Sequence, residues 1–182
     1  MTTRCKRRDE LEDEIKLLKR ECILNIDTIQ ELKKQTVKYR FDSLTMLKGR
    51  IDFEDDFTSM FNKGEQFYLI IADINGLKNA NIKGYENGDF LILKCVKDLI
   101  GCNPCGDKHL YRYGGDEFVI LFPFNRGFNS RNFNCPSDEF TIASKASDDF
   151  NSSVEMFKSC NELLLKRKAE FYKKNPNNRR ET

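Results

Sequence analysis

The stretch Arg112-Tyr113-Gly114-Gly115-Asp116-Glu117-Phe118 decides the fold of this chain. A strand-like run, 109–113, leads into it, and a second run, 118–122, leads out of it. Two such runs joined by a short glycine-containing connection predict a β-hairpin. The two glycines let the backbone pass close to a ligand, because no Cβ stands in the way. The two adjacent carboxylates repel each other unless a cation lies nearby, so the turn predicts a divalent metal and a phosphate-bearing substrate.

A second acid stands at the end of another predicted strand. Residues 66–73 contain a continuous apolar run, 67–72, which is typical of a strand buried on both faces, and Asp73 stands at its end. Ligands in open sheets bind just outside such strand ends. A crossover from this strand to 109–113 would place the two strands side by side or nearly so, with Asp73 near the hairpin acids. Because Mg²⁺ takes one or two carboxylates plus phosphate oxygens, this edge predicts phosphoryl transfer.

The remaining apolar patterns predict an alternation of helices and strands. Residues 51–62 predict a helix before the first strand, and residues 90–100 predict another helix after it. Beyond the hairpin, 139–144 reads as a short strand and 154–174 as a final helix, separated from the hairpin by an Asn-rich loop. The predicted order after residue 40 is helix, strand, two helices, three strands, helix. No glycine-rich G-x-x-x-x-G-K-[ST] loop occurs, so any phosphates are held in another way.

The N-terminal residues 6–40 contain neither glycine nor proline and predict one long helix. A 4-3 spacing of mostly apolar residues, assigned to the a and d positions of a heptad repeat, continues over about four heptads. This indicates a coiled coil and a parallel homodimer through residues 8–40. The members of this seam are Leu11, Ile15, Leu18, Cys22, Asn25, Ile29, Leu32, Thr36 and Tyr39. The alternative is a helix packed on its own globular domain, which the off-seam apolar residues Leu17, Ile23, Leu24 and Ile26 keep open.

Composition narrows the classes of function. The net charge of +2 comes from 31 basic and 29 acidic residues among 182, so no nucleic-acid partner is expected. No run of roughly 18 apolar residues and no signal-peptide pattern occurs, so neither a membrane span nor secretion is expected. Seven cysteines without a close-set framework predict reduced thiols and a cytoplasmic protein. Cys102 and Cys105 would form a zinc site only if His109 and Cys135 joined them.

The motifs together resemble a known family. Residues 112–118 are identical to the name-giving motif of the GGDEF family, the diguanylate cyclases. Residues 42–50 resemble the family's D-x-L-T-x-L-x-N-R, with Gly49 in place of Asn. Residues 73–89 resemble D-x-D-x-F-K-x-x-N-D-x-x-G-H-x-x-G-D, and 164–172 resemble its last helix. The resemblance covers about residues 42–175.

This resemblance implies an α+β fold, an α/β-type sandwich like nucleotide cyclases and polymerase palms. It implies a mostly antiparallel sheet flanked by helices and preceded by the coiled-coil helix. The expected domains are 1–40 for dimerisation, 41–175 for catalysis and 176–182 as a flexible tail. The implied reaction joins two GTP molecules into cyclic di-GMP, with release of pyrophosphate, across a dimer of half-sites.

The resemblance also implies roles for individual residues at the metal edge. Asp73 and Glu117 would bind Mg²⁺ or Mn²⁺, helped by the carbonyl of Ile74. Asp116 would assist metal binding or activate the 3′-hydroxyl. Gly114 and Gly115 would let the backbone pass beside the phosphates.

Other residues would hold the substrate. Asn81 and Asp89 would hydrogen-bond the guanine edge, because a carboxylate suits the N–H donors of guanine. Lys78 and Lys174 would neutralise phosphate, and Arg112 would also contact substrate.

Several positions depart from the family pattern. Asn75 replaces the second acid of D-x-D, the spacing from Asn81 to Asp89 is one residue shorter, and Tyr85 replaces the usual His. Cys105 and Lys108 stand where the Arg-x-x-Asp product-inhibition site is usual, so that site is expected to be absent. The Asn-rich loop replaces a helix, and Arg179 lies near the usual second phosphate-binding position. These departures keep two alternatives open: a weak or inactive GTP-binding module that regulates a partner, or a cyclase that uses another nucleotide.

Overall fold

The protein is described by a computed structural model that covers residues 3–103, 106–124 and 139–176. The chain divides into two compact units, Met1–Arg40 and Phe41–Thr182, and each is described by itself. The predicted tail 176–182 therefore lies outside the described residues except for its first residue, and most of the predicted Asn-rich loop also lies outside them.

The first unit is a single helix, α1 (Thr3–Arg40), as predicted. Its described large apolar side chains are about half exposed or more within the chain; Leu11 and Ile29 of the predicted seam are 51% and 50% exposed. The off-seam residues Leu17 and Leu24 are exposed to a similar extent, at 58% and 65%. The side chains of residues 33–39, which include Thr36 and Tyr39 of the seam, lie outside the description. No described helix has the length and apolar character needed to cross a membrane.

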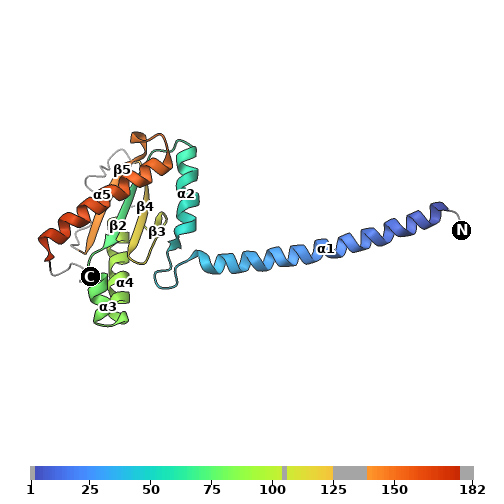
Figure 1. Cartoon of the computed structure of the whole chain (residues 1–182), viewed down its shortest axis with the longest axis horizontal. Coiled ribbons are helices and arrows are strands. Elements are labelled where there is room, and N and C mark those ends of the chain that lie inside the picture. Colours follow the sequence, from blue (N-terminus) through green and yellow to red (C-terminus); the bar gives the residue numbers. More distant parts are fainter. Residues whose placement is uncertain (1–2, 104–105, 125–138, 177–182) are drawn as a thin grey trace. The chain divides into compact units, whose positions relative to one another are not determined.

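The second unit contains a five-stranded sheet in the order β1-β3-β4-β2-β5 (Figure 1). Its strands are β1 (Lys48–Gly49), β2 (Phe67–Ile74), β3 (Leu110–Arg112), β4 (Glu117–Pro123) and β5 (Phe140–Ala146). Among the strands that the structure describes, β1 and β3 pair in parallel and the other three pairings are antiparallel. The predicted hairpin is confirmed as β3 and β4, and β4 lies between β3 and β2. The two predicted acidic strand ends therefore meet through β4.

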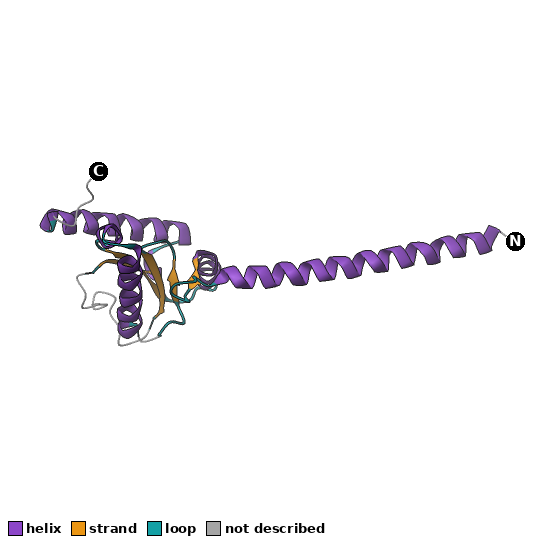
Figure 2. Cartoon of the chain, turned by 90° about the horizontal axis from the view of Figure 1, so that it is seen from below, coloured by secondary structure: helices purple, strands orange, loops and turns teal. Residues whose placement is uncertain are grey.

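Helices cover both faces of the sheet, which confirms the predicted α+β sandwich. One face carries α2 (Arg50–Asn62) and α5 (Ser153–Lys174), and the other carries α3 (Leu77–Ile82) and α4 (Tyr85–Cys102). In Figure 2 the strands lie between α5 and α4. All eight residues of β2 are buried, and its side chains contribute alternately to the two cores. This is the two-sided burial that its continuous apolar run predicts.

Helix α4 differs from the prediction at its start and on its inner face. It begins at Tyr85 rather than at residue 90, because Gly84 with φ 129° turns the chain from α3 directly into it. A backbone conformation with this φ favours glycine. Leu93, predicted to lie on the inner face, is 45% exposed, because the row of buried residues passes through Ile92, Cys95 and Val96 instead. The buried residues of the helix are Gly88, Ile92, Cys95, Val96 and Leu99.

Candidate functional site

The predicted metal-binding acids lie on adjacent strands. The antiparallel register of β2 and β4 places Asp73 directly opposite Glu117. Beyond this pair, the Ile74 N–H donates to the carbonyl of Asp116 at 2.9 Å, which fixes the hairpin turn against the end of β2. Opposed residues of antiparallel strands have Cβ atoms about 5 Å apart and on the same face. The convergence of Asp73 with the hairpin acids, expected from the sequence, is therefore confirmed.

Asp73 is a buried acid held beside a lysine. It is 3% exposed, and the Lys168 ammonium of α5 lies 2.6 Å from its Oδ1. At this distance the contact is a charge-assisted ion pair. Burial raises the pKa of Asp73 from 3.8 to about 6; Lys168 opposes this shift, and the charges of Asp116 and Glu117 add to it. A carboxylate with this pKa is one that a cation would stabilise.

Lys168 is a site residue that the sequence analysis missed. The signal was present in α5, where Cys160 and Leu164 are buried one helical turn apart and Lys168 continues that row by another turn. Residues four apart in a helix share a face, so this lysine had to point toward the sheet. The same spacing leaves Lys174 exposed at the end of α5.

The glycine turn is held by backbone and by Arg112. The N–H groups of Tyr113 and Gly114 both donate to the Glu117 carbonyl, at 2.8 and 3.1 Å. The Arg112 guanidinium donates to the carbonyls of Gly114 and Gly115 and to Asp42 Oδ1, the last at 2.8 Å. The sequence predicted that Arg112 contacts substrate. In the structure, the guanidinium contacts other residues of the protein. These contacts position the turn, and the contact of Arg112 with substrate stays a prediction.

Asp42 connects this turn to the beginning of the domain. Besides Arg112, it accepts hydrogen bonds from the N–H and hydroxyl of Thr45, at 2.8 and 2.7 Å. Burial acts to raise the pKa of Asp42, but the hydrogen bonds from Thr45 and Arg112 outweigh it and hold that pKa below its ordinary value. The residues 42–45 and 112–115, which lie far apart in the sequence, therefore form one hydrogen-bonded unit.

A small cavity lies next to Asp73. It brings together Lys78 from the first turn of α3, Asp116 from the hairpin turn and Lys168 from α5. Its other lining residues are Ile74, Gly76, Leu77, Asn79 and Tyr172. Two cationic side chains in a cavity beside two acids form a site with both signs of charge. Such a site suits a phosphate group that arrives together with a metal ion.

The predicted guanine-binding residues lie on the two helices that cover the other face. Asn81 is in α3, and Asp89 is exposed in the first turns of α4. Gly88 is buried, and a Cβ at this position would overlap the side-chain carbonyl of Asn81. Gly88 therefore creates the space that the Asn81 side chain occupies.

Substitution of this glycine provides a direct test of the Asn81 position. At the guanine site that the resemblance implies, we expect Gly88→Ala to displace Asn81 and to weaken GTP binding about tenfold, the effect of losing one strong hydrogen-bonded contact. Isothermal titration with GTP measures the change. Gly101→Ala in the same helix is the matched control, because a Cβ there meets nothing within 4 Å. Equal affinities of the two variants would contradict the role of Asn81.

The departures from the family pattern have different structural contexts. Asn75 is buried at 7% exposure; it accepts from the Thr141 hydroxyl at 2.8 Å, and its N–H donates to the Glu139 carbonyl at 2.7 Å. Asn75 therefore joins the end of β2 to β5. Tyr85, which replaces the usual His, is 83% exposed. Cys105, Cys135 and Arg179 lie outside the described residues. The zinc alternative and the expected absence of the product-inhibition site, which depend in part on these residues, therefore stay predictions.

The described side chains can be compared with the ligands that a divalent metal ion needs. In the part of the chain that the structure describes, no three His, Cys, Asp or Glu side chains gather to hold a metal by themselves. The two carboxylates of Asp73 and Glu117 fit Mg²⁺ nevertheless, because this ion keeps several waters and shares its coordination with substrate phosphates. The donor set thus suits an ion that binds together with a nucleotide.

Comparisons with known proteins concern the same region. The family model described as diguanylate cyclase, GGDEF domain, matches residues 39–130. The probable diguanylate cyclase DgcI of Escherichia coli is 37% identical over 82 residues, which cover 44% of this chain and 18% of that protein. Diguanylate cyclase VdcA of Vibrio cholerae is 37% identical over 101 residues, covering 52% and 29%. The chain spans at most 38% of the length of the four curated relatives it matches.

Solved structures share the fold at lower identity. The GGDEF domain of TpbB, or YfiN, from Pseudomonas aeruginosa superposes with a TM-score of 0.63 at 20% identity, covering 71% of this chain and 89% of that one. The coiled coil and GGDEF domain of DgcB from Caulobacter crescentus, in complex with c-di-GMP, gives 0.57 at 20% identity, covering 82% and 92%.

Proposed function

This chain belongs to the GGDEF family, and from that membership we propose that it is a diguanylate cyclase. In the proposed reaction the 3′-hydroxyl of each GTP attacks the α-phosphorus of the other. Two phosphodiester bonds form, two pyrophosphates leave, and each hydroxyl proton passes to a base or to solvent. The observation that carries the proposal is the register of Asp73 opposite Glu117, next to the cavity lined by Lys78 and Lys168.

Each residue of this site has a part in the proposal. Asp73, Glu117 and the Ile74 carbonyl would hold Mg²⁺ or Mn²⁺, which when bound neutralises phosphate charge and polarises the reacting oxygens. Lys168 pairs with Asp73 at 2.6 Å and is placed to move onto the triphosphate when the acid binds metal. Lys78 would neutralise the same group. Asp116, in the cavity lining, is placed to accept a proton from the 3′-hydroxyl.

Binding of the guanine base would involve α3 and α4, on the opposite face of the sheet from α5. Asn81, held by the space at Gly88, and Asp89 would read the guanine edge, since a carboxylate accepts from two adjacent N–H donors of guanine. Adenine presents a different donor pattern on that edge, so GTP is the proposed substrate in preference to ATP.

The reaction needs two half-sites, and α1 offers a means to bring them together. The exposed apolar seam of α1, with Leu11 and Ile29 about half exposed, supports a parallel homodimer through residues 8–40. A dimer raises the effective concentration of one half-site at the other to the millimolar range. The proposal places the chain in the cytoplasm, where GTP is available and thiols stay reduced.

A second candidate is a GGDEF-like GTP-binding module with little or no turnover. It is favoured by Asn75, which takes the place of an acid and is committed to a hydrogen bond with Thr141. In that case the nucleotide would bind at the same cavity, and the chain would regulate a partner.

A turnover assay with product identification separates these candidates. Purified full-length protein is incubated with GTP and Mg²⁺ or Mn²⁺, and the products are identified by mass spectrometry. We expect cyclic di-GMP and pyrophosphate, with at least about 100-fold less product from Glu117→Gln, because several kcal/mol of charge stabilisation are removed. Product at the level of Glu117→Gln, together with intact GTP binding, would support the binding module instead.

Lys168 provides a test of the phosphate site. We expect Lys168→Met to weaken GTP binding about tenfold, since a charge-assisted contact contributes about 1.5–3 kcal/mol. Titration of the nucleotide at fixed Mg²⁺ measures this change. Lys166→Met, an exposed position two residues away in α5, serves as the control and should bind as the unmodified protein does. A similar loss in both variants would contradict a specific role of Lys168.

A further inference from the structure

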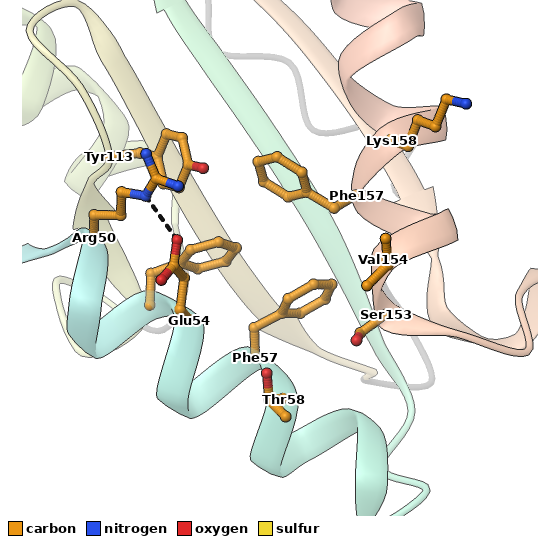
Figure 3. Close-up of a pocket in the computed structure, with 10 residues that line it drawn as sticks. Arg50, Glu54, Phe57, Thr58, Tyr113, Ser153, Val154, Phe157 and Lys158 are labelled. Carbon is orange, nitrogen blue, oxygen red and sulfur yellow. Dashed lines mark hydrogen bonds and ion pairs between the residues drawn. The ribbon is translucent and has the colours of Figure 1, made fainter.

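A second cleft lies on the face of the sheet that α2 and α5 cover, between the first turns of these two helices. Its volume is about 390 Å³, which falls in the range of pockets that bind small molecules. Figure 3 shows Phe57 and Thr58 on α2, facing Val154 and Phe157 on α5, with Tyr113 at the end of the cleft. None of its lining residues is shared with the cavity beside Asp73.

Four aromatic rings form the walls of the cleft. Phe53 and Phe57 are 1% and 5% exposed and stack with centroids 5.3 Å apart, so the floor is preformed. Tyr113 meets Phe53 edge to face at 5.6 Å and Phe157 at 5.4 Å with a tilt of 46°. Rings held in such tilted arrangements present both faces and edges to a guest, which favours a planar aromatic ligand over a flexible aliphatic one.

The rim of the cleft carries charges of both signs with one cation in excess. The Arg50 guanidinium lies 4.8 Å from the Tyr113 ring centroid, and its Nε donates to Glu54 at 2.7 Å. Lys158 stands at the outer edge on α5; in Figure 3 its ammonium is directed away from the other residues drawn and interacts with none of them. One acid against two cations leaves the rim positive, which attracts an anion to an otherwise apolar cleft.

We propose that this cleft binds a small planar aromatic anion, such as an arene carboxylate or sulfonate. The rings would enclose the aromatic part, and the anionic group would lie at the rim near Arg50, with Lys158 adding positive potential from the outer edge. The site adjoins the hairpin, because Tyr113 directly precedes Gly114 and its N–H donates to the Glu117 carbonyl at 2.8 Å. A ligand in the cleft would thus touch the strand that leads into the glycine turn.

The test uses 8-anilinonaphthalene-1-sulfonate as the probe and its fluorescence on titration into the full chain. Thr58→Trp and Val154→Trp would fill the cleft from exposed positions on α2 and α5, and each is expected to weaken probe binding at least about tenfold. Two variants are used so that a folding defect in one, detected by circular dichroism, does not decide the result.

Charge variants test the chemical class of the ligand. Lys158→Gln should weaken probe binding about threefold and Glu54→Gln should strengthen it by a similar factor, as expected for partly screened rim charges. Lys166→Gln, also on α5 but outside the cleft, is the matched control and should bind as the unmodified chain does. The neutral analogue N-phenyl-1-naphthylamine should not respond to either rim substitution. Unchanged probe binding in both tryptophan variants would place the probe elsewhere, for example on α1, and would overturn the proposal.

Discussion

Asp73→Asn is expected to abolish product formation and, at the same time, to stabilise the metal-free protein at pH 7.5. The activity should fall at least about 100-fold, because the variant loses an anionic metal ligand worth several kcal/mol in the transition state. The stability should rise because the native protein has to keep a buried carboxylate ionised at this pH. Asp73 is 3% exposed, and burial raises its pKa to about 6 in the folded state.

The sign of the pH effect follows from this raised pKa. Between pH 3.8, the ordinary value, and pH 6, the folded state holds a proton that the unfolded state has released. Stability therefore falls as pH rises through this window and stays lower above it. One pKa unit corresponds to about 1.4 kcal/mol, so the cost at pH 7.5 is about 3 kcal/mol, with the opposing effect of Lys168 already included.

Thermal unfolding of the metal-free protein between pH 4 and 8 checks the prediction. The unmodified chain should lose several degrees of Tm from this carboxylate, and Asp73→Asn should lack that loss. Asp107→Asn, an exposed acid in the loop before β3, is the control and should follow the unmodified profile. If Asp73→Asn were less stable than the unmodified chain at pH 7.5, the burial argument would be wrong. Retained turnover in this variant would instead remove Asp73 from the metal site.

Disruption of the α1 seam is expected to have the second large effect, on both dimerisation and turnover. Leu18→Glu together with Ile29→Glu should produce a monomer, because two charges at core positions of each helix repel across a coiled-coil interface. At micromolar protein, turnover per chain should fall at least about 100-fold, since the millimolar effective concentration of the partner half-site is lost. GTP binding should persist, because the cavity beside Asp73 belongs entirely to the second unit.

A matched variant distinguishes the seam from the rest of the helix. Leu17→Glu together with Leu24→Glu adds the same charges at similarly exposed positions off the seam and should leave both dimer and turnover nearly unchanged. Sedimentation equilibrium and the turnover assay at several protein concentrations measure both properties. A monomeric unmodified chain would favour the alternative in which the helix packs on its own domain. Equal losses in both double variants would contradict the heptad assignment.

The sequence by itself determined the α+β architecture and the edge of the sheet where the acids meet. The continuous apolar run of β2 indicated two-sided burial, and the paired runs around 112–118 indicated the hairpin. These features are local, because the burial of a strand and the formation of a tight turn are determined by residues that are neighbours in the sequence. The start of α4 was not determined in this way. Glycine and asparagine in 84–88 resemble a turn, whereas in the structure they begin the helix.

Only the tertiary structure decided which distant side chains share the site. The pairing of Lys168 with Asp73, the close packing of the Asn81 side chain on Gly88, and the joining of Arg112 to Asp42 each depend on how separate elements pack. The same is true of the aromatic cleft between α2 and α5, whose four rings come from three segments. Periodicity states which face of an element is buried, but not which residue of another element lies against it. That choice depends on strand register and helix packing, which are properties of the whole fold.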